Sequence, residues 1–388
     1  MIDRRVLITG ARAAAALDLA RDFHAAGWQV HLADSRAVRM ARWSRLPVRH
    51  HLYPPPRTQQ AAFRQSIAEL VAQHEIELVV PVCEEVFHLA APTLHAVLGD
   101  RLFAPDLATL RSLHDKLAFA RACQRWELPV PDSHPIADAK ALARFAATSS
   151  DWVFKPRFSR FGDRALIAPD ARALRRIDPA VPGGWMAQRR ISGDEVCFHA
   201  VAYRGALVAF AAYRSEWRLG GGASYAFEPS VEGHARSLHA IAETLADSAK
   251  LHGQFACDVM FDAAGAPFLL ECNPRATSGV HLLAGEGGLA RTIGDGVVLP
   301  GASHRTACLG PAMWLFGLPR ALRGGKVAEW RRLVVDGRDA ISRPGDRAPI
   351  AGALADFAGF FLTGIRHNVS TNGATTFDIE WNGEDLER

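Results

Sequence analysis

The sequence predicts a mixed fold, α/β and α+β, with an N-terminal parallel sheet, then a two-lobed domain and a C-terminal extension. Two observations carry this prediction. Short apolar runs alternate with amphipathic stretches over the first hundred residues, and strand-like runs dominate from about residue 152 to residue 273. A chain of 388 residues is also too long for one compact core. We expect domains at 1–105, 106–298 and 299–388, and we expect the middle one to consist of lobes 106–182 and 183–298.

The first hundred residues repeat a strand–helix rhythm. Apolar runs at 6–8, 29–33 and 77–81 read as strands, and the stretches 13–26 and 60–74 between them read as helices. Strands that alternate with helices predict a parallel sheet covered by helices.

A dinucleotide-binding turn is the rival interpretation of this region. Thr9 and Gly10 follow the first strand, and Asp34 ends the next strand, near the position of a ribose-binding acid. The second and third glycines of that fingerprint are absent, so the backbone cannot approach a pyrophosphate closely. The proline-rich stretch 46–57 reads as an extended connector, and we expect its paired His50 and His51 to be solvated and without function.

The composition is that of an ordinary globular protein. Hydrophobic residues make up 49%, charged residues 22%, and the net charge is +4. Basic residues are spread along the chain, which disfavours a nucleic-acid partner. The six cysteines lack metal-finger spacing and no run reaches the roughly 20 apolar residues of a membrane helix. We therefore expect a cytoplasmic protein with no membrane partner.

The strongest chemical signal lies at 255–275, where two apolar runs flank a turn and predict a β-hairpin. Side chains alternate along a strand, so Glu271 and Asn273 should share one face, and Leu270 and Cys272 the other. With Asp258 on the same side, three oxygen-bearing side chains would converge, which suits Mg²⁺. A merely solvated hairpin is disfavoured, because acids in such apolar runs are costly to bury alone.

With these residues the chain resembles the ATP-grasp superfamily, which includes D-alanine–D-alanine ligase, biotin carboxylase and carbamoyl phosphate synthetase. The resemblance covers roughly residues 1–285 and implies a pre-ATP-grasp domain followed by an ATP-grasp domain. It implies that Asp258, Glu271 and Asn273 hold Mg²⁺, with Mn²⁺ as an alternative ion. It also implies that Arg275 contacts the substrate or the acyl phosphate.

Two lysines match the family in order. Asp115–Lys116 and Lys155–Pro156 resemble its two phosphate-binding segments, so both lysines are expected to bind ATP. Two cations on separate segments can neutralise a polyphosphate during transfer. The loop 157–164 has one glycine and three arginines instead of the family's glycine- and serine-rich pattern. It reads either as a loop that closes over the phosphates or as an ordinary basic turn.

The residues that resemble the family's adenine- and ribose-binding positions lie further along the chain. Residues around Gln188, Arg190 and Ile191 resemble the hinge that pairs with adenine, and Glu195 resembles the acid that binds the ribose hydroxyls. Many relatives have Glu where Gln188 stands, so the adenine contacts can differ here.

The segments around Arg218 and around Glu84 and Glu85 each allow two interpretations. Arg218 precedes three glycines, Gly220 to Gly222, which resemble a loop over the carboxylate end or form a plain glycine-rich hairpin. Glu84 and Glu85 follow a parallel strand, where ligands of open sheets bind. Either acid could read a substrate amine, or each could favour the dipole of the next helix.

The resemblance implies a ligase that phosphorylates a carboxylate, releases ADP and passes the acyl phosphate to an amine, most readily that of an amino acid. Lys155, Arg218 and Arg275 would act on the reacting groups. The alternatives are another acceptor, such as a thiol or a carboxyphosphate route, and an ATP-binding regulator without turnover. The expected partners are a small carboxylate, a small amine and a second copy of the chain in a homodimer.

Overall fold

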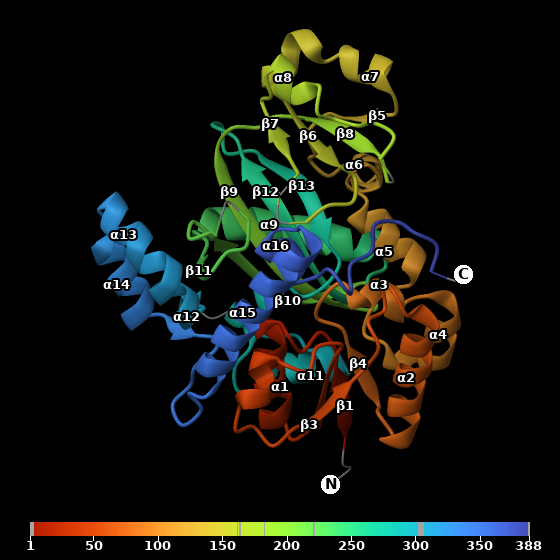
Figure 1. Ribbon diagram of the computed structural model, residues 1–388, viewed down its shortest axis with the longest axis vertical. Helices are drawn as coiled ribbons and strands as arrows, with labels where there is room; N and C mark the ends of the chain where they lie inside the picture. The colour runs from red at the N-terminus through yellow and green to blue at the C-terminus, as the bar shows by residue number, and fades with distance from the viewer. Residues whose placement is uncertain are drawn as a thin grey trace.

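The chain folds around three β-sheets arranged along its long axis (Figure 1). The computed structural model describes residues 4–160, 162, 164–181, 183–219, 222–301 and 306–386. In Figure 1 the N-terminal sheet lies at the bottom, a seven-stranded sheet lies in the middle and a small four-stranded sheet at the top. Among the described residues, no helix is both long and apolar enough to cross a membrane.

The N-terminal region is the predicted parallel sheet with helices on its faces. Its strands follow the order β3-β2-β1-β4. Its elements are β1 (Arg5–Ile8), α1 (Ala14–Ala25), β2 (Gln29–Asp34), η1 (Met40–Trp43), β3 (Arg49–Leu52), α2 (Gln60–Gln73), β4 (Leu78–Val80), α3 (Glu85–Leu89), α4 (Pro92–Leu98) and η2 (Gly99–Arg101).

The interpretation of 46–57 as a simple connector is wrong. Its middle forms β3, which pairs in parallel with β2 and extends the sheet by one edge strand. The strand is short and polar and is flanked by prolines, so its own residues carry little strand signal. Pairing with β2 supplies the backbone hydrogen bonds that hold it extended.

The first lobe carries the small antiparallel sheet, in the order β5-β8-β6-β7. Its elements are α5 (Leu107–His114), α6 (Lys116–Arg125), β5 (Ser133–Ile136), α7 (Ala139–Ala143), η3 (Ala146–Asp151), β6 (Trp152–Pro156), β7 (Leu166–Ile167), α8 (Ala171–Leu174) and β8 (Trp185–Arg189).

The helical stretch that opens this lobe consists of two helices, α5 and α6, divided at Asp115. This residue leaves the helical conformation, with φ −68° and ψ 106°, and its carboxylate accepts hydrogen bonds from the backbone N–H groups of Leu117 and Ala118. An aspartate at an N-cap satisfies amides that have no partner within the helix. The break makes Lys116 the first residue of α6.

The second lobe is built on the largest sheet, in the order β13-β12-β9-β10-β11-β14-β15. Its elements up to residue 295 are β9 (Asp194–Tyr203), β10 (Ala206–Arg214), β11 (Ala226–Pro229), α9 (Glu232–Ser248), β12 (Gly253–Phe261), β13 (Pro267–Asn273), α10 (Val280–Leu283) and α11 (Gly288–Asp295). The strands β12 and β13 form the hairpin expected at 255–275.

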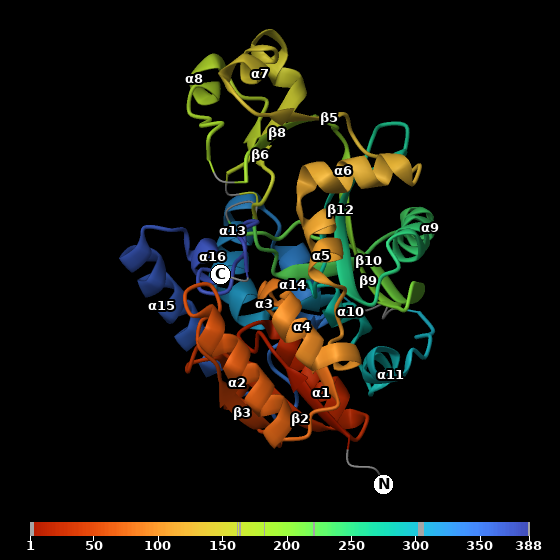
Figure 2. The same ribbon diagram turned by 90° about the vertical axis from the view of Figure 1, so that its right-hand side faces the viewer.

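The C-terminal region belongs to the same body. Two short strands complete the large sheet, and the rest is mostly helical: β14 (Ala307–Cys308), α12 (Gly310–Ala312), η4 (Met313–Gly317), α13 (Leu318–Gly324), α14 (Val327–Val335), β15 (Arg338–Asp339), α15 (Pro349–His367) and α16 (Thr371–Ala374). The last part returns to the N-terminal domain (Figure 2). Asp378 pairs with Arg12 at 2.6 Å, and the Trp381 ring is buried 4.9 Å from the Phe87 ring. The domain bounds proposed above stay a prediction.

Candidate functional site

A cavity of about 300 Å³ lies between the small sheet and the large sheet. Strands and helices of both lobes line it, from α6 and β6 on one side to β9, β10, β12 and β13 on the other. Eight of the residues singled out from the sequence line this cavity: Lys116, Lys155, Glu195, Arg218, Asp258, Glu271, Asn273 and Arg275.

Strand register brings the acids together. Asp258 of β12 lies opposite Glu271 of β13 on one side and opposite Cys197 of β9 on the other. The Cys197 thiol donates a hydrogen bond to Oδ1 of Asp258 at 3.1 Å. Neighbours in register share a sheet face, so these side chains form one row along the cavity floor.

A β-bulge corrects one detail of the alternation. The register shifts between Asp258 and Val259, so that Leu270 has no opposite residue in β12. Cys272 is buried, as predicted, but Leu270 lines the cavity instead of facing away from it. Because a bulge leaves one residue out of the ladder, the Leu270 carbonyl is available to other donors. The Lys155 ammonium donates to it at 3.2 Å.

Both lysines lie against one acid. The Lys116 and Lys155 ammonium groups are 3.3 Å and 3.9 Å from Oε2 of Glu271. Burial opposes ionisation of Glu271, but these two charges outweigh burial and lower its pKa to about 2. Burial lowers the pKa of Lys155 to about 8, although Glu271 opposes the shift. The two cations and the acid therefore form one charged group on the cavity wall.

Asp258 is held differently. Burial raises its pKa to about 7, and the carboxylates of Glu271 and Glu195 act in the same direction. No lysine, arginine or histidine of the described chain forms an ion pair with it. The carboxylates of Asp258 and Glu271 and the Asn273 amide line the same cavity, and together they offer the oxygen donors that Mg²⁺ prefers. These residues fit a hard divalent cation.

Glu195 and Arg218 hold each other across the cavity. The two guanidinium nitrogens of Arg218 donate to the two carboxylate oxygens of Glu195, at 2.6 Å and 3.0 Å, and its Nε donates to the Ser215 carbonyl at 2.6 Å. Such a two-point pair is stronger and more directional than a single contact. Glu195, which we expect at the ribose, is thus paired with Arg218, which we expect at the substrate carboxylate.

Arg275 is positioned by a buried acid of the N-terminal domain. Its Nε donates to Glu84 at 2.9 Å, and a terminal nitrogen donates to the Asn273 side chain at 3.3 Å. Arg160 lies 2.8 Å from the other oxygen of Glu84. Glu84 thus orients two arginines that line the cavity.

The acids at 84 and 85 lie at the start of α3, Glu84 at its N-cap and Glu85 in its first turn, as one of the two interpretations of the sequence expects. Glu84 is fully buried against the two arginines described above. Oε1 of Glu85 accepts hydrogen bonds from the Thr9 hydroxyl and the Val82 and Cys83 amides, at 2.7, 3.1 and 3.2 Å. The sequence could not show the contacts with Thr9, Arg160 and Arg275, because these partners come from distant segments.

The hinge residues lie outside the cavity lining. Gln188 is buried, and its amide donates to the Ser133 hydroxyl at 3.3 Å and to the Leu270 carbonyl at 3.5 Å. Arg190 is exposed and Ile191 is partly buried. The backbone N–H of Arg190 donates to the Asp151 carbonyl. Gln188 thus shares the Leu270 carbonyl with Lys155, whereas no contact of the described chain brings Arg190 or Ile191 to the acids and lysines.

The two loops are described in part. Phe161 and Asp163 of the first loop, and Gly220 and Gly221 of the second, lie outside the described residues. Sequence reasoning missed several small or polar lining residues: Cys197, Tyr213, Ser215, Thr277 and Ser278. Cys197 could have been found from strand alternation, because it follows Glu195 by two positions on β9.

Comparison with known proteins identifies this unit. A family model described as an ATP-grasp domain matches residues 113–279. The chain contains an ATP-grasp domain. The resemblance drawn from the sequence is confirmed, and every one of the eight residues gathered at the cavity lies within the matched span.

Solved structures share the fold over most of the chain. The N5-carboxyaminoimidazole ribonucleotide synthetase of Thermotoga maritima matches with a TM-score of 0.56 and 15% identity over 78% of each chain. The L-amino acid ligase of Bacillus licheniformis matches with a TM-score of 0.55 and 15% identity, over 76% of this chain and 72% of that one.

A third match is the biotin carboxylase domain dimer of the Hydrogenobacter thermophilus 2-oxoglutarate carboxylase, in complex with MgADP, ADP and bicarbonate. Its TM-score is 0.59 and its identity 14%, over 73% of this chain and 66% of that one. Identities this low establish the fold alone. Among curated proteins, none matches this chain significantly.

Proposed function

We propose that the protein is an ATP- and Mg²⁺-dependent, ADP-forming ligase that activates a carboxylate as an acyl phosphate for attack by an amine. The amine would be that of an amino acid or a related small metabolite. One observation carries the proposal: two lysines of the first lobe meet the acids of the β12–β13 hairpin across a single cavity.

The lysines would bind the ATP phosphates. Lys116 and Lys155 now share Glu271, and both ammonium groups also donate to carbonyls, those of Ser159 and Leu270. Asp258, Glu271 and Asn273 would hold Mg²⁺, or Mn²⁺ in its place. When bound, the ion neutralises the charge of the phosphates. The lysines supply the same charge compensation from the opposite wall.

Arg275 would orient the carboxylate. Glu84, Asn273 and the Ala276 carbonyl use three of its N–H groups and keep the guanidinium at the cavity wall. Of its five N–H groups, others remain to bind a carboxylate or an acyl phosphate. Arg218 would act at the same end, and Glu195 would bind the ribose. The adenine contacts of Gln188, Arg190 and Ile191 are part of the proposal and require the hinge to face the nucleotide.

The similar structures support one acceptor and one further candidate for the activated group. One is named an L-amino acid ligase, which agrees with an amine acceptor. Another was solved with MgADP and bicarbonate, which favours bicarbonate as a second candidate for the activated carboxylate. That structure is also a dimer, and a homodimer of this chain stays a proposal.

A substrate screen tests the proposal. The protein is incubated with ATP, Mg²⁺ and pooled carboxylates and amines, with bicarbonate in separate wells, and ADP and products are followed by mass spectrometry. We expect ADP formation that depends on one carboxylate. Binding of ATP without ADP formation in any pool would instead indicate a regulator.

Two variants tie the turnover to the cavity. Glu271→Ala and Asn273→Ala should each lower kcat by about 10² or more, because they remove contacts made mainly in the transition state. Glu232→Ala is the control, since this acid of α9 has a side chain 89% exposed and far from the lining. Near-normal turnover in either cavity variant at saturating Mg²⁺ would remove that residue from the metal site.

A further inference from the structure

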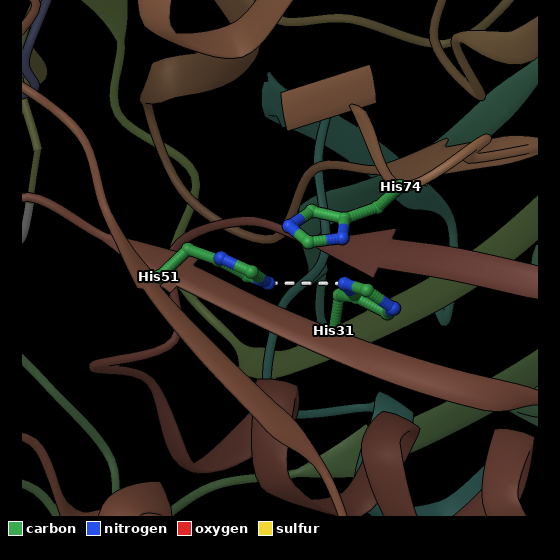
Figure 3. A group of neighbouring side chains, drawn as sticks. All are labelled: His31, His51 and His74. Atoms are coloured by element: carbon green, nitrogen blue, oxygen red, sulfur yellow. Dashed lines mark hydrogen bonds between the residues drawn. The ribbon is translucent and has the colours of Figure 1, made fainter. Parts of the chain in front are cut away.

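Three histidines meet on the N-terminal sheet, away from the ATP-grasp cavity (Figure 3). His31 lies on β2, His51 lies on β3, and His74 directly follows α2. The two strands are paired in parallel with His31 opposite Arg49 and His51 opposite Ala33. His31 and His51 therefore point to the same face of the sheet, the face on which His74 arrives from α2.

The ring nitrogens are close enough to share one ion. Nδ1 of His31 and Nε2 of His51 are joined by a hydrogen bond of 3.0 Å, and one nitrogen of each of the three rings lies within 4.8 Å of the others. Two nitrogens bound to one tetrahedral Zn²⁺ at about 2.0–2.1 Å are separated by about 3.3 Å. The first pair already has nearly this spacing. A rotation of the partly exposed His74 ring shortens the longer separations.

One ring nitrogen of His31 has no partner in the described chain, although it is not the nitrogen that contacts His51. This atom, Nε2, is buried. Buried polar atoms without partners are uncommon in folded proteins. Burial lowers the pKa of His31 and of His51 to about 4, so that at neutral pH both rings are uncharged, the form that binds metals.

Three arginines lie near the cluster. Arg5 is paired with Glu75, next to His74, and Arg49 is exposed, so its charge is screened by water. The third, Arg39, is buried and donates a hydrogen bond to the His51 carbonyl at 2.9 Å. A cavity of about 320 Å³ at the amino ends of β2 and β3 includes His31 and Arg49 in its lining. Of the three histidines, His31 alone lines this cavity.

We propose that His31, His51 and His74 bind one Zn²⁺ ion, with water in the fourth position. Three imidazole ligands suit zinc, whereas Mg²⁺ prefers oxygen. The ion would replace the hydrogen bond between His31 and His51 and would join β2, β3 and the end of α2. The competing explanation is that three neutral histidines simply pack together.

The test is a zinc titration of the chelator-treated, nucleotide-free protein against a competing chromophoric chelator. We expect one tight Zn²⁺ per chain and a rise in Tm on its addition. His51→Gln and His74→Gln should each weaken the binding by about 100-fold, because each removes one of three protein ligands. His50→Gln is the matched control, since His50 is partly buried on the same strand but is not part of the cluster.

Two further measurements separate zinc binding at the histidines from zinc binding elsewhere. The titration is repeated with Asp258→Asn, which should not change the tight site, because the acid cavity is a different place. Co²⁺ in place of Zn²⁺ should give the visible absorption of a tetrahedral ion in the wild type and lose it in His74→Gln. The proposal is overturned if the wild type binds no zinc, or if His51→Gln and His74→Gln bind it as tightly as the wild type does.

Discussion

Asp258 is partly buried in the hairpin cavity and Asp18 is buried at the contact between α1 and the C-terminal region, but only Asp18 forms ion pairs with cations of the described chain. Asp18 of α1 lies 2.8 Å from His281, 3.0 Å from Arg338 and 2.7 Å from Arg343. Burial would raise the pKa of Asp18, yet the hydrogen bond with His281 and the arginine charges hold it well below its ordinary value. For Asp258, burial and two neighbouring acids raise the pKa to about 7.

The difference separates two uses of a buried acid. An acid surrounded by cations of its own chain joins segments that are distant in sequence, here α1 and residues 281, 338 and 343. An ionised carboxylate that lies close to other carboxylates has a high free-energy cost, unless a bound cation or another positively charged ligand compensates its charge. The first arrangement serves the fold, and we infer that the second serves a ligand.

The largest expected effect is on stability. Asp18→Asn should lower the free energy of unfolding by about 3–5 kcal/mol, because it leaves buried cations without their partner. Urea denaturation measures the change, with Asp247→Asn as the control, since the Asp247 side chain is 74% exposed. If the two variants were equally stable, Asp18 would not be the structural acid described here.

The pH dependence of stability sharpens the same point. The folded-state pKa of Asp18 lies below its ordinary value of 3.8, so its stabilisation is present above that pH and is lost as the pH falls below it. His281, Arg338, Arg343 and Arg21 face this carboxylate. Unfolding of the wild type between pH 5 and 2, compared with Asp18→Asn, should show a decline that is smaller in the variant.

The opposite outcome is expected for Asp258→Asn. Turnover should fall by about 10² because a metal contact is lost, while the free energy of unfolding should stay within about 1 kcal/mol of the wild type. ADP formation and urea denaturation are measured on the same preparation. A variant that unfolds as readily as Asp18→Asn would end the distinction between the two regions.

A smaller effect is expected at the ribose. Glu195→Ala should weaken ATP binding by about tenfold, the loss of roughly one strong hydrogen bond, and should leave 2′-deoxy ATP nearly unaffected. Calorimetric Kd values for the two nucleotides check this, with Asp194→Ala as the neighbouring control, since that acid pairs with Arg214. A variant that still prefers ATP strongly would show that another group reads the ribose.

The smallest effect is expected at the carboxylate. Arg275→Lys keeps the charge but loses the planar fork, so KM for the carboxylate should rise about three- to tenfold while the Kd for ATP is unchanged. Arg218→Lys should act in the same way, unless its pair with Glu195 links the two substrates. Loss of ATP affinity with normal carboxylate kinetics would assign these arginines to the nucleotide.

Much of the fold and of the cavity could be predicted because the relevant patterns are local. Strand–helix alternation is visible within thirty or forty residues, and so the parallel sheet was predictable, except for β3, whose polar residues depend on pairing with β2. The separation of Glu271 and Asn273 by two positions was enough to place them on one side of a strand. Their assignment to a metal stays a prediction.

The amino-acid sequence by itself determined the order of the two lysines and the acid hairpin, because such motifs depend on residue type and short spacing. Only the tertiary structure decided the bulge at Leu270, the position of Asp258 opposite Glu271, and the pair of Arg275 with Glu84, which is 191 residues away. It also brought His31, His51 and His74 together from three elements. Register and long-range charge pairing follow from how whole strands and helices pack, and no local pattern records that packing.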